Sequence, residues 1–172
     1  MKNTLTTIFI AVLICFSLTS FSQTTLKIGH VDLAKIMEAL PERDTAAAVL
    51  QRETNQVQST YNEMTVVYNK LLDDYEKGKA TFSEIIRKNK EAELLDKEKR
   101  IQEFEQNAQT GLNKRNTELI QPILDKVLKA INKVAADNGF TYILDVSKGS
   151  VIYTSKDSQN INDLVLKILK PL

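Results

Sequence analysis

Residues 47–75 read AAVLQRETNQVQSTYNEMTVVYNKLLDDY, and this stretch decides the fold. Nine positions in it are spaced alternately by three and four residues, and all but Thr54 are apolar or aromatic: Ala47, Leu50, Thr54, Val57, Tyr61, Met64, Tyr68, Leu71 and Tyr75. Heptad spacing of this kind places the nine side chains on one narrow stripe of an α-helix, and most of the residues between them are polar or charged. The pattern predicts one arm of a coiled coil over residues 42–77.

The chain is predicted to turn back near residues 77–81. Gly78 is a residue that helix C-termini prefer, and the sequence from Thr81 to Glu84 matches a capping box that would start a second helix. This helix is predicted from Phe82 to about Asp137, with a sparse seam of Leu94 or Leu95, Ile101, Phe104, Ala108 and Leu112. Because it is longer than the first arm, its excess must lie outside the hairpin.

The two ends of the sequence predict a small mixed body. Residues 26–32 favour a strand, and Asp32 is placed to cap a short helix up to Leu40, before Pro41. After Pro122, which is expected to kink the second helix, the apolar stripe becomes as wide as that of a core helix. Residues 140–146 and 151–154 predict a β-hairpin around a turn at 147–150, and a last helix is capped by Ser158 or Asn160.

The fold class predicted is therefore α+β and mostly helical. A long antiparallel coiled-coil hairpin, residues 42–117 with its tip near 77–81, projects from a small β-containing body formed by residues 23–41 and 118–172. Three short strands make a sheet too small to stand alone, and its two edges would be exposed. Self-assembly through the body is expected to solve both problems.

Residues 1–22 read as a secretory signal peptide. Lys2 gives a positive start, residues 8–16 form an apolar run, and small residues precede a cleavage site near Ser22. The run is too short to span a bilayer, which disfavours a retained anchor. A lipoprotein would use Cys15, but Ile14 stands where processing needs a small residue. Removal of the segment leaves 22 basic and 22 acidic residues and no cysteine.

Composition and motifs exclude several classes of function. The near-zero net charge disfavours nucleic-acid binding, which needs a basic face. A single His30 and no mature cysteine exclude a disulfide framework or a Cys/His metal cluster, and no phosphate loop or nucleophile motif occurs. His30 therefore favours a packed or interface residue over a catalytic base. We expect no enzyme, no cofactor and no metal.

The order of motifs resembles the Skp/OmpH family of periplasmic chaperones. It runs from Lys-Ile-Gly-His-Val-Asp at 27–32, through the charged hairpin, to Leu-Ile-Gln-Pro-Ile-Leu at 119–124 and Ala-Asp-Asn-Gly-Phe-Thr-Tyr-Ile-Leu-Asp at 136–145. The resemblance implies a homotrimer with a β-rich trimerisation body and three hairpins around a cavity that holds unfolded outer-membrane β-barrel proteins without ATP. It also implies the periplasm as location, and it offers no nucleic-acid partner. A lipopolysaccharide or membrane-surface contact has been proposed for the arms of the family, but no residue-by-residue match carries it over to this chain. The neutral mature charge departs from well-known members, which are strongly basic.

Three groups of residues become candidates under this resemblance. The client-contact candidates lie toward the tip and are Val66, Val67, Leu72, Tyr75, Phe82, Ile85 and Ile86. A basic cluster at the tip comprises Lys77, Lys79, Arg87, Lys88 and Lys90. The trimer-body candidates are Ile28, His30, Val31, Tyr142, Leu144, Val146 and Ile152.

Two alternatives stay open for these residues. Aromatic residues on heptad positions, such as Tyr75, are favoured as seam rather than client surface, and basic residues at a tip are usually a solvated surface. As a whole, the hairpin also fits a periplasmic coiled-coil adaptor that docks a fixed partner through its tip.

Overall fold

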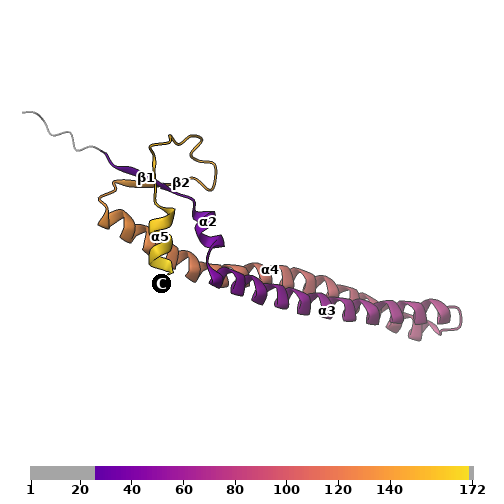
Figure 1. Ribbon diagram of the computed structural model, residues 1–172. Helices are drawn as coiled ribbons and strands as arrows, with labels where there is room; N and C mark the ends of the chain where they lie inside the picture. The colour runs from indigo at the N-terminus through magenta and orange to yellow at the C-terminus, as the bar shows by residue number, and fades with distance from the viewer. Residues whose placement is uncertain (1–25, 171–172) are drawn as a thin grey trace, which may run out of the picture.

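The structure is a computed structural model that describes residues 26–170, so the predicted signal peptide lies outside the described residues. Figure 1 shows a small body at one end, from which a long helical hairpin projects. The elements in chain order are β1 (Ile28–Val31), α2 (Leu33–Glu38), α3 (Pro41–Gly78), α4 (Glu84–Asp137), β2 (Tyr142–Asp145), β3 (Gln159–Asn160) and α5 (Asn162–Leu169). The predicted fold class, α+β and mostly helical with a long hairpin, is confirmed.

The hairpin consists of α3 and α4, which lie side by side along the whole of α3 (Figure 1). Their 38 and 54 residues correspond to lengths of about 57 Å and about 81 Å at 1.5 Å per residue. The excess of α4 enters the body, where Ile123, Val127 and Val134 are buried. The helix continues through Pro122 without ending there.

The seam between the two helices is narrow and only partly buried. All but one of the nine predicted heptad residues of α3 are half-buried; the exception is Ala47, whose neighbour Ala46 is buried instead. On α4 the alternative left open by the sequence is resolved, since Leu94 is 9 % exposed and Leu95 is 70 % exposed. Ile101, Phe104, Ala108 and Leu112 are half-buried as predicted.

The start of α4 differs from the prediction. The capping residue is Ser83 and not Thr81, because the helix begins at Glu84, two residues later than predicted. The Ser83 Oγ accepts a hydrogen bond from the Ile86 N–H at 3.4 Å, whereas the Thr81 hydroxyl donates to the Gly78 carbonyl at 2.9 Å. Phe82 therefore stays outside the helix and is free to fold back toward α3.

The sheet has the order β2-β1-β3, and both pairings are parallel. The predicted antiparallel hairpin is therefore wrong: residues 151–154 form no strand, and the third strand lies further along the chain, at 159–160. A parallel strand must start at the same end of the sheet as β1, so the chain needs residues 146–158 to return there. We call residues 146–158 the return loop. Ile152 in this loop is 97 % exposed and lies outside the sheet in which it was predicted to lie.

The inner face of the sheet covers the core. Val31 is buried there together with Ile36 and Leu40 from the α2 region, Val127 from α4 and Val165 from α5. Gly29 also faces inward, and a Cβ at this position would lie 2.8 Å from the Phe140 ring and 2.9 Å from the Ile143 side chain. Val31 is thus a core residue of the single chain and not a candidate for contact with another copy.

A polar junction joins the carboxyl ends of the strands. The Asp32 N–H donates to Asn162 Oδ1 at 2.9 Å, and Asp32 Oδ1 accepts from the Lys35 N–H at 3.0 Å, as a predicted helix cap should. Asp145 Oδ1 accepts from the N–H groups of Leu33 at 3.3 Å and Ser147 at 2.9 Å, while its Oδ2 accepts from the Ser147 hydroxyl. Burial opposes ionisation of Asp145, but these hydrogen bonds outweigh it and lower its pKa.

We expect Asp145→Ala to destabilise the body by about 1–2 kcal/mol at neutral pH, because two backbone N–H groups lose their acceptor. Since the pKa of Asp145 is lowered in the folded chain, its contribution is present above the ordinary value of 3.8 and is lost as the pH falls below it. Urea unfolding followed by circular dichroism at neutral and acid pH measures both effects. Asp157→Ala, in the exposed return loop, is the control, and an equal loss in both variants would contradict the assignment.

Candidate functional site

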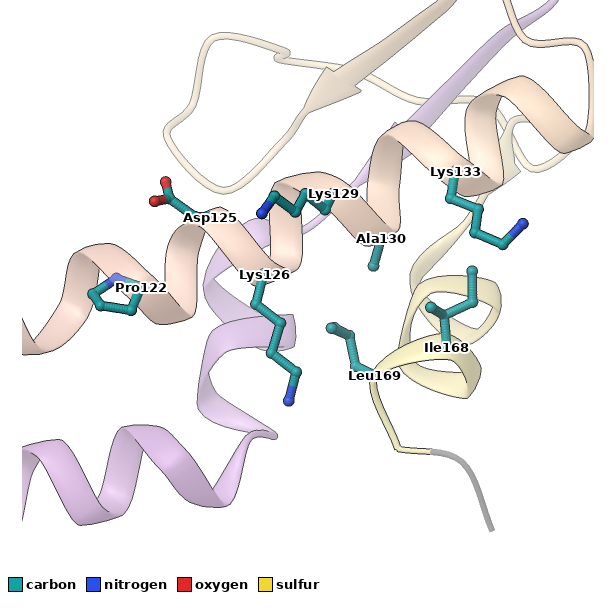
Figure 2. Close-up of a pocket in the computed structure, with 8 residues that line it drawn as sticks. All are labelled: Pro122, Asp125, Lys126, Lys129, Ala130, Lys133, Ile168 and Leu169. Atoms are coloured by element: carbon teal, nitrogen blue, oxygen red, sulfur yellow. The ribbon is translucent and has the colours of Figure 1, made fainter.

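A hollow lies between the base of α4 and the end of α5 (Figure 2). It has a volume of about 510 Å³, an apolar floor that includes Ala130 and Leu169, and a rim of lysines. Two of these lysines already have partners: Lys126 bonds Glu42 of α3 at 2.5 Å, and Lys133 bonds Asp137 at 2.8 Å. The first of these pairs lowers the pKa of Glu42 and ties the start of α3 to α4. The ion pair on its rim therefore helps to join the arm to the body.

The arm carries apolar side chains that the hairpin itself does not bury. Four of the predicted client-contact residues are exposed: Val66 (67 %), Val67 (54 %), Ile85 (74 %) and Ile86. Leu72, Tyr75 and Phe82 are half-buried instead. Leu95, for which the sequence offered a seam position as an alternative, is the fifth exposed large apolar residue of the arm. The arm thus presents a dispersed apolar surface, without a deep pocket.

Tyr75 and Phe82 make the side-chain contacts that hold the tip of the hairpin together. The Tyr75 hydroxyl donates to Glu91 Oε1 at 2.6 Å, and this hydrogen bond raises the pKa of Tyr75. The Tyr75 and Phe82 rings lie 6.3 Å apart and are tilted by 42°. A Cβ on Gly78 would lie 2.2 Å from the Phe82 ring, so the ring occupies the space that only glycine leaves free. The tip of the hairpin is therefore tied across its two helices.

The basic residues of the tip are each paired with a carboxylate. Lys77 pairs with Asp73 and Lys79 with Glu76, while Lys88 lies 3.0 Å from Glu84. Arg87 lies 4.0 Å from Glu91, and Lys90 lies 3.8 Å from Glu93. The residues of each pair are three or four apart in the sequence, and every side chain in them is at least 36 % exposed, so each pair contributes little to stability. The tip is consequently a surface of mixed charge rather than a positive patch.

The two helices are tied to each other at the tip and near the base. Among residues 26–170, ion pairs between α3 and α4 join Glu42 to Lys126 and Glu53 to Arg115, the latter at 3.1 Å. The hydrogen bond from Tyr75 to Glu91 makes the tie at the tip. Between these ties, α4 places the half-buried Lys97 where the seam spacing from Leu94 and Ile101 would place an apolar residue. The seam therefore lacks one apolar side chain between Leu94 and Ile101.

Two grooves flank this thin seam. One has a volume of about 330 Å³ and is lined by residues that include Val57, Tyr61, Phe104 and Ala108. The other has a volume of about 290 Å³ and is lined by Glu63, Met64, Val67, Lys97, Arg100 and Ile101. We call the second one the mid-arm groove. The two grooves share no residue.

The outer face of the sheet gathers most of the remaining candidates. The register pairs Ile28 with Tyr142 and His30 with Leu144, and paired residues of a parallel sheet lie on the same face. Ile28, Tyr142 and Leu144 are exposed, and His30 is half-exposed beside them. Val146 follows β2 and is half-buried, and its N–H donates to the Val31 carbonyl at 2.9 Å. The single chain therefore leaves an apolar sheet face uncovered.

Several of these features were not predicted from the sequence. Lys97 could have been found by continuing the heptad three residues past Leu94, but a charged residue at a seam position carries no signal of its own. The Phe82 ring over Gly78 and the hydrogen bond from Tyr75 to Glu91 depend on how the turn aligns the two helices, which no local pattern states. Tyr153, 81 % exposed in the return loop, was assigned to a strand.

Within residues 26–170, no three His, Cys, Asp or Glu side chains are grouped so that they could bind a metal ion. In the same residues no helix combines the length and the apolar character that a bilayer crossing requires.

Comparisons with known proteins all lead to one group. The family model described as Outer membrane protein (OmpH-like) matches residues 27–169. The chain is 28 % identical to the chaperone protein Skp of Photorhabdus luminescens over 91 % of this chain and 93 % of that one. It is 26 % identical to Skp of Pectobacterium atrosepticum over 78 % and 82 % of the two chains. The solved structure of an OmpH-like chaperone from Caulobacter crescentus matches with a TM-score of 0.71 at 15 % identity, over 83 % of this chain and 82 % of that one.

Substitutions at two glycines of the hairpin should have opposite effects. Gly78→Ala should destabilise the arm by about 1 kcal/mol, because the new methyl displaces the Phe82 ring. Gly111→Ala should stabilise it by about 0.5–1 kcal/mol, because Gly111 lies inside α4 and a Cβ there meets open space. Urea unfolding followed by far-ultraviolet circular dichroism compares the two variants. Equal effects would show that Phe82 does not hold the tip.

Proposed function

The chain belongs to the family of OmpH-like outer membrane proteins, and from this membership we propose that it is a periplasmic holdase for unfolded outer-membrane β-barrel proteins that works without ATP. The named relatives in this family are chaperones and not enzymes, which agrees with the prediction that this chain is not an enzyme. The predicted signal peptide over residues 1–22 supports export to the periplasm.

One observation carries the holdase proposal: large apolar side chains lie exposed and dispersed along a projecting arm. They lie on both helices, and only Val67 lines one of the two grooves described above: Val66, Val67, Ile85, Ile86 and Leu95. An unfolded chain presents apolar side chains in no fixed arrangement, so a long surface with many weak contacts suits it better than one shaped cavity. Weak contacts also allow release without an energy source.

Apolar contact, rather than net charge, is proposed to capture the client. Residues 23–172 carry equal numbers of basic and acidic side chains, and the tip cations are paired with neighbouring carboxylates. Screening by salt weakens long-range attraction between exposed charges but leaves apolar burial intact. Binding should therefore depend little on salt. For the same reason, contact with lipopolysaccharide or a membrane surface forms no part of this proposal.

We further propose that three copies assemble through the outer face of the sheet. Ile28, Tyr142 and Leu144 would be buried there, with His30 among them. The free edges of β2 and β3 offer unpaired backbone groups, and the β-prone residues 151–154 of the return loop are available to pair with them in a neighbouring copy. Ile152 would then be covered in the assembly, although the single chain exposes it. Three arms would project around one cavity.

An adaptor that docks a fixed partner is the second candidate function, and the ordered tip favours it. The Phe82 ring over Gly78 and the exposed Ile85 give the tip a defined shape. Replacing residues 78–81 by an unrelated turn separates the two functions. An adaptor should lose its partner, whereas a holdase should keep most of its activity.

The holdase proposal predicts that the purified mature protein suppresses aggregation of a β-barrel outer-membrane protein diluted from urea, without ATP. Light scattering measures the suppression, at low salt and again at high salt. Suppression at both salt concentrations is expected, because apolar contacts carry the binding. No suppression at a threefold excess of chaperone would contradict the proposal.

Leu144→Glu should dissociate the trimer, because it places a charge on the outer face of the sheet. Leu164→Glu is the matched control, since Leu164 on α5 is exposed to the same extent, 42 %, but lies away from that face. Sedimentation analysis of both variants measures the mass. A trimeric Leu144→Glu variant would show that the copies meet elsewhere.

A further inference from the structure

We propose that the mid-arm groove binds one aromatic side chain of an unfolded client. The inference rests on the proposed holdase function and adds to it a site and a side-chain class. Its floor is apolar and comes from Met64 and Val67 on α3 and Ile101 on α4. Its rim carries the cations Lys97 and Arg100.

The position of the groove explains why it is open. On α3, Met64 lies midway between Glu53 and Tyr75, the residues that tie the arm near its base and at its tip. Lys97 stands in the seam between Leu94 and Ile101, so α4 supplies less apolar bulk here than a complete heptad would. The groove of about 290 Å³ lies at this deficit, between the two ties. Such a volume suits one large side chain.

The charges on the rim favour an aromatic occupant. Cations are attracted to the negative face of an aromatic ring, and arginine also stacks on it. Arg100 Nε lies 2.8 Å from Asp96 Oδ2, which orients the guanidinium, and no ion pair engages Lys97 among the described residues. The flexible, polarisable Met64 adds a favourable sulfur–aromatic contact and adapts to rings of different shape. An aliphatic side chain would gain only the apolar floor.

The other groove of the arm shows the contrast. Its lining already contains the aromatic rings of Tyr61 and Phe104, and its polar residues are Thr54, Gln58, Glu105 and Gln109. Its carboxylate, Glu105, has no cation beside it in the lining and would repel the negative face of a ring. In the mid-arm groove the one carboxylate, Glu63, is accompanied by the two cations Lys97 and Arg100. The preference for an aromatic occupant therefore belongs to the mid-arm groove and not to the arm in general.

Two neighbouring valines provide a matched test. Val66 and Val67 are both exposed, but only Val67 lines the groove. Val67→Glu introduces a carboxylate next to Lys97 and Arg100, whereas Val66→Glu introduces the same charge outside the groove. We expect Val67→Glu to raise the concentration of protein needed for half-suppression of client aggregation about threefold, and Val66→Glu to leave it within experimental error. Equal effects of both variants would overturn the groove while leaving the holdase function intact.

A second measurement does not depend on holdase activity. In the full mature protein, methyl resonances of Met64 and Ile101 are followed by NMR during titration with N-acetyl-tryptophanamide or N-acetyl-leucinamide. The tryptophan probe should shift both methyls and bind about threefold more tightly than the leucine probe, and Lys97→Gln should weaken it about twofold. Equal binding of the two probes, or no shift with either, would overturn the proposal. If the wild type fails to suppress aggregation but the tryptophan probe still binds, the holdase function fails and the groove stands.

Discussion

The narrow seam between α3 and α4 is the interaction on which the rest of the structure depends. It is one side chain wide on each helix, and most of its members are only half-buried, so each contributes less than the 1.5–3 kcal/mol or so of a fully buried apolar residue. Ties at the tip and near the base keep the two helices together despite this weakness. A long arm with low local stability results, and surfaces that adapt to a ligand are usually found in such regions.

The body differs from the arm, because its core is well buried, whereas its sheet is small and exposed on one face. Val127, Val165 and Ile36 lie on three helices and are fully buried in the core below the inner face of the sheet. Within residues 26–170, no element covers the outer face or the two edges of the sheet. A three-stranded sheet with two-residue β3 gains little from its own pairing. The same chain thus combines a projecting arm with a sheet face that the proposed trimer would cover.

Local patterns predicted the helices well and the sheet poorly, for a physical reason. The heptad from Leu50 to Tyr75 and the Asp32 cap act between residues a few positions apart, so the sequence states them directly. Strand order depends on distant partners: Ile161 is buried and Asn162 accepts from the Asp32 N–H, which aligns β3 with β1 and leaves residues 151–154 in a loop. The exposure of Val66 and Val67 followed from their heptad positions. The mid-arm groove could not be predicted from the sequence, because it depends on how α4 is aligned against α3. The turn at the tip sets this alignment.

Charge pairing along the arm determines what kind of recognition remains. Most acidic and basic residues of the arm form ion pairs with residues three or four positions away on the same helix. These pairs keep the surface hydrophilic but do not attract a client from a distance. Lys97 is different, because it lies beside the apolar floor of the mid-arm groove. In our proposal it contacts the bound aromatic side chain there. In the proposed trimer each arm carries one such weak site, and binding at one arm raises the effective concentration of the client at the other two. Retention then comes from the number of arms engaged, and release needs only that each contact be weak.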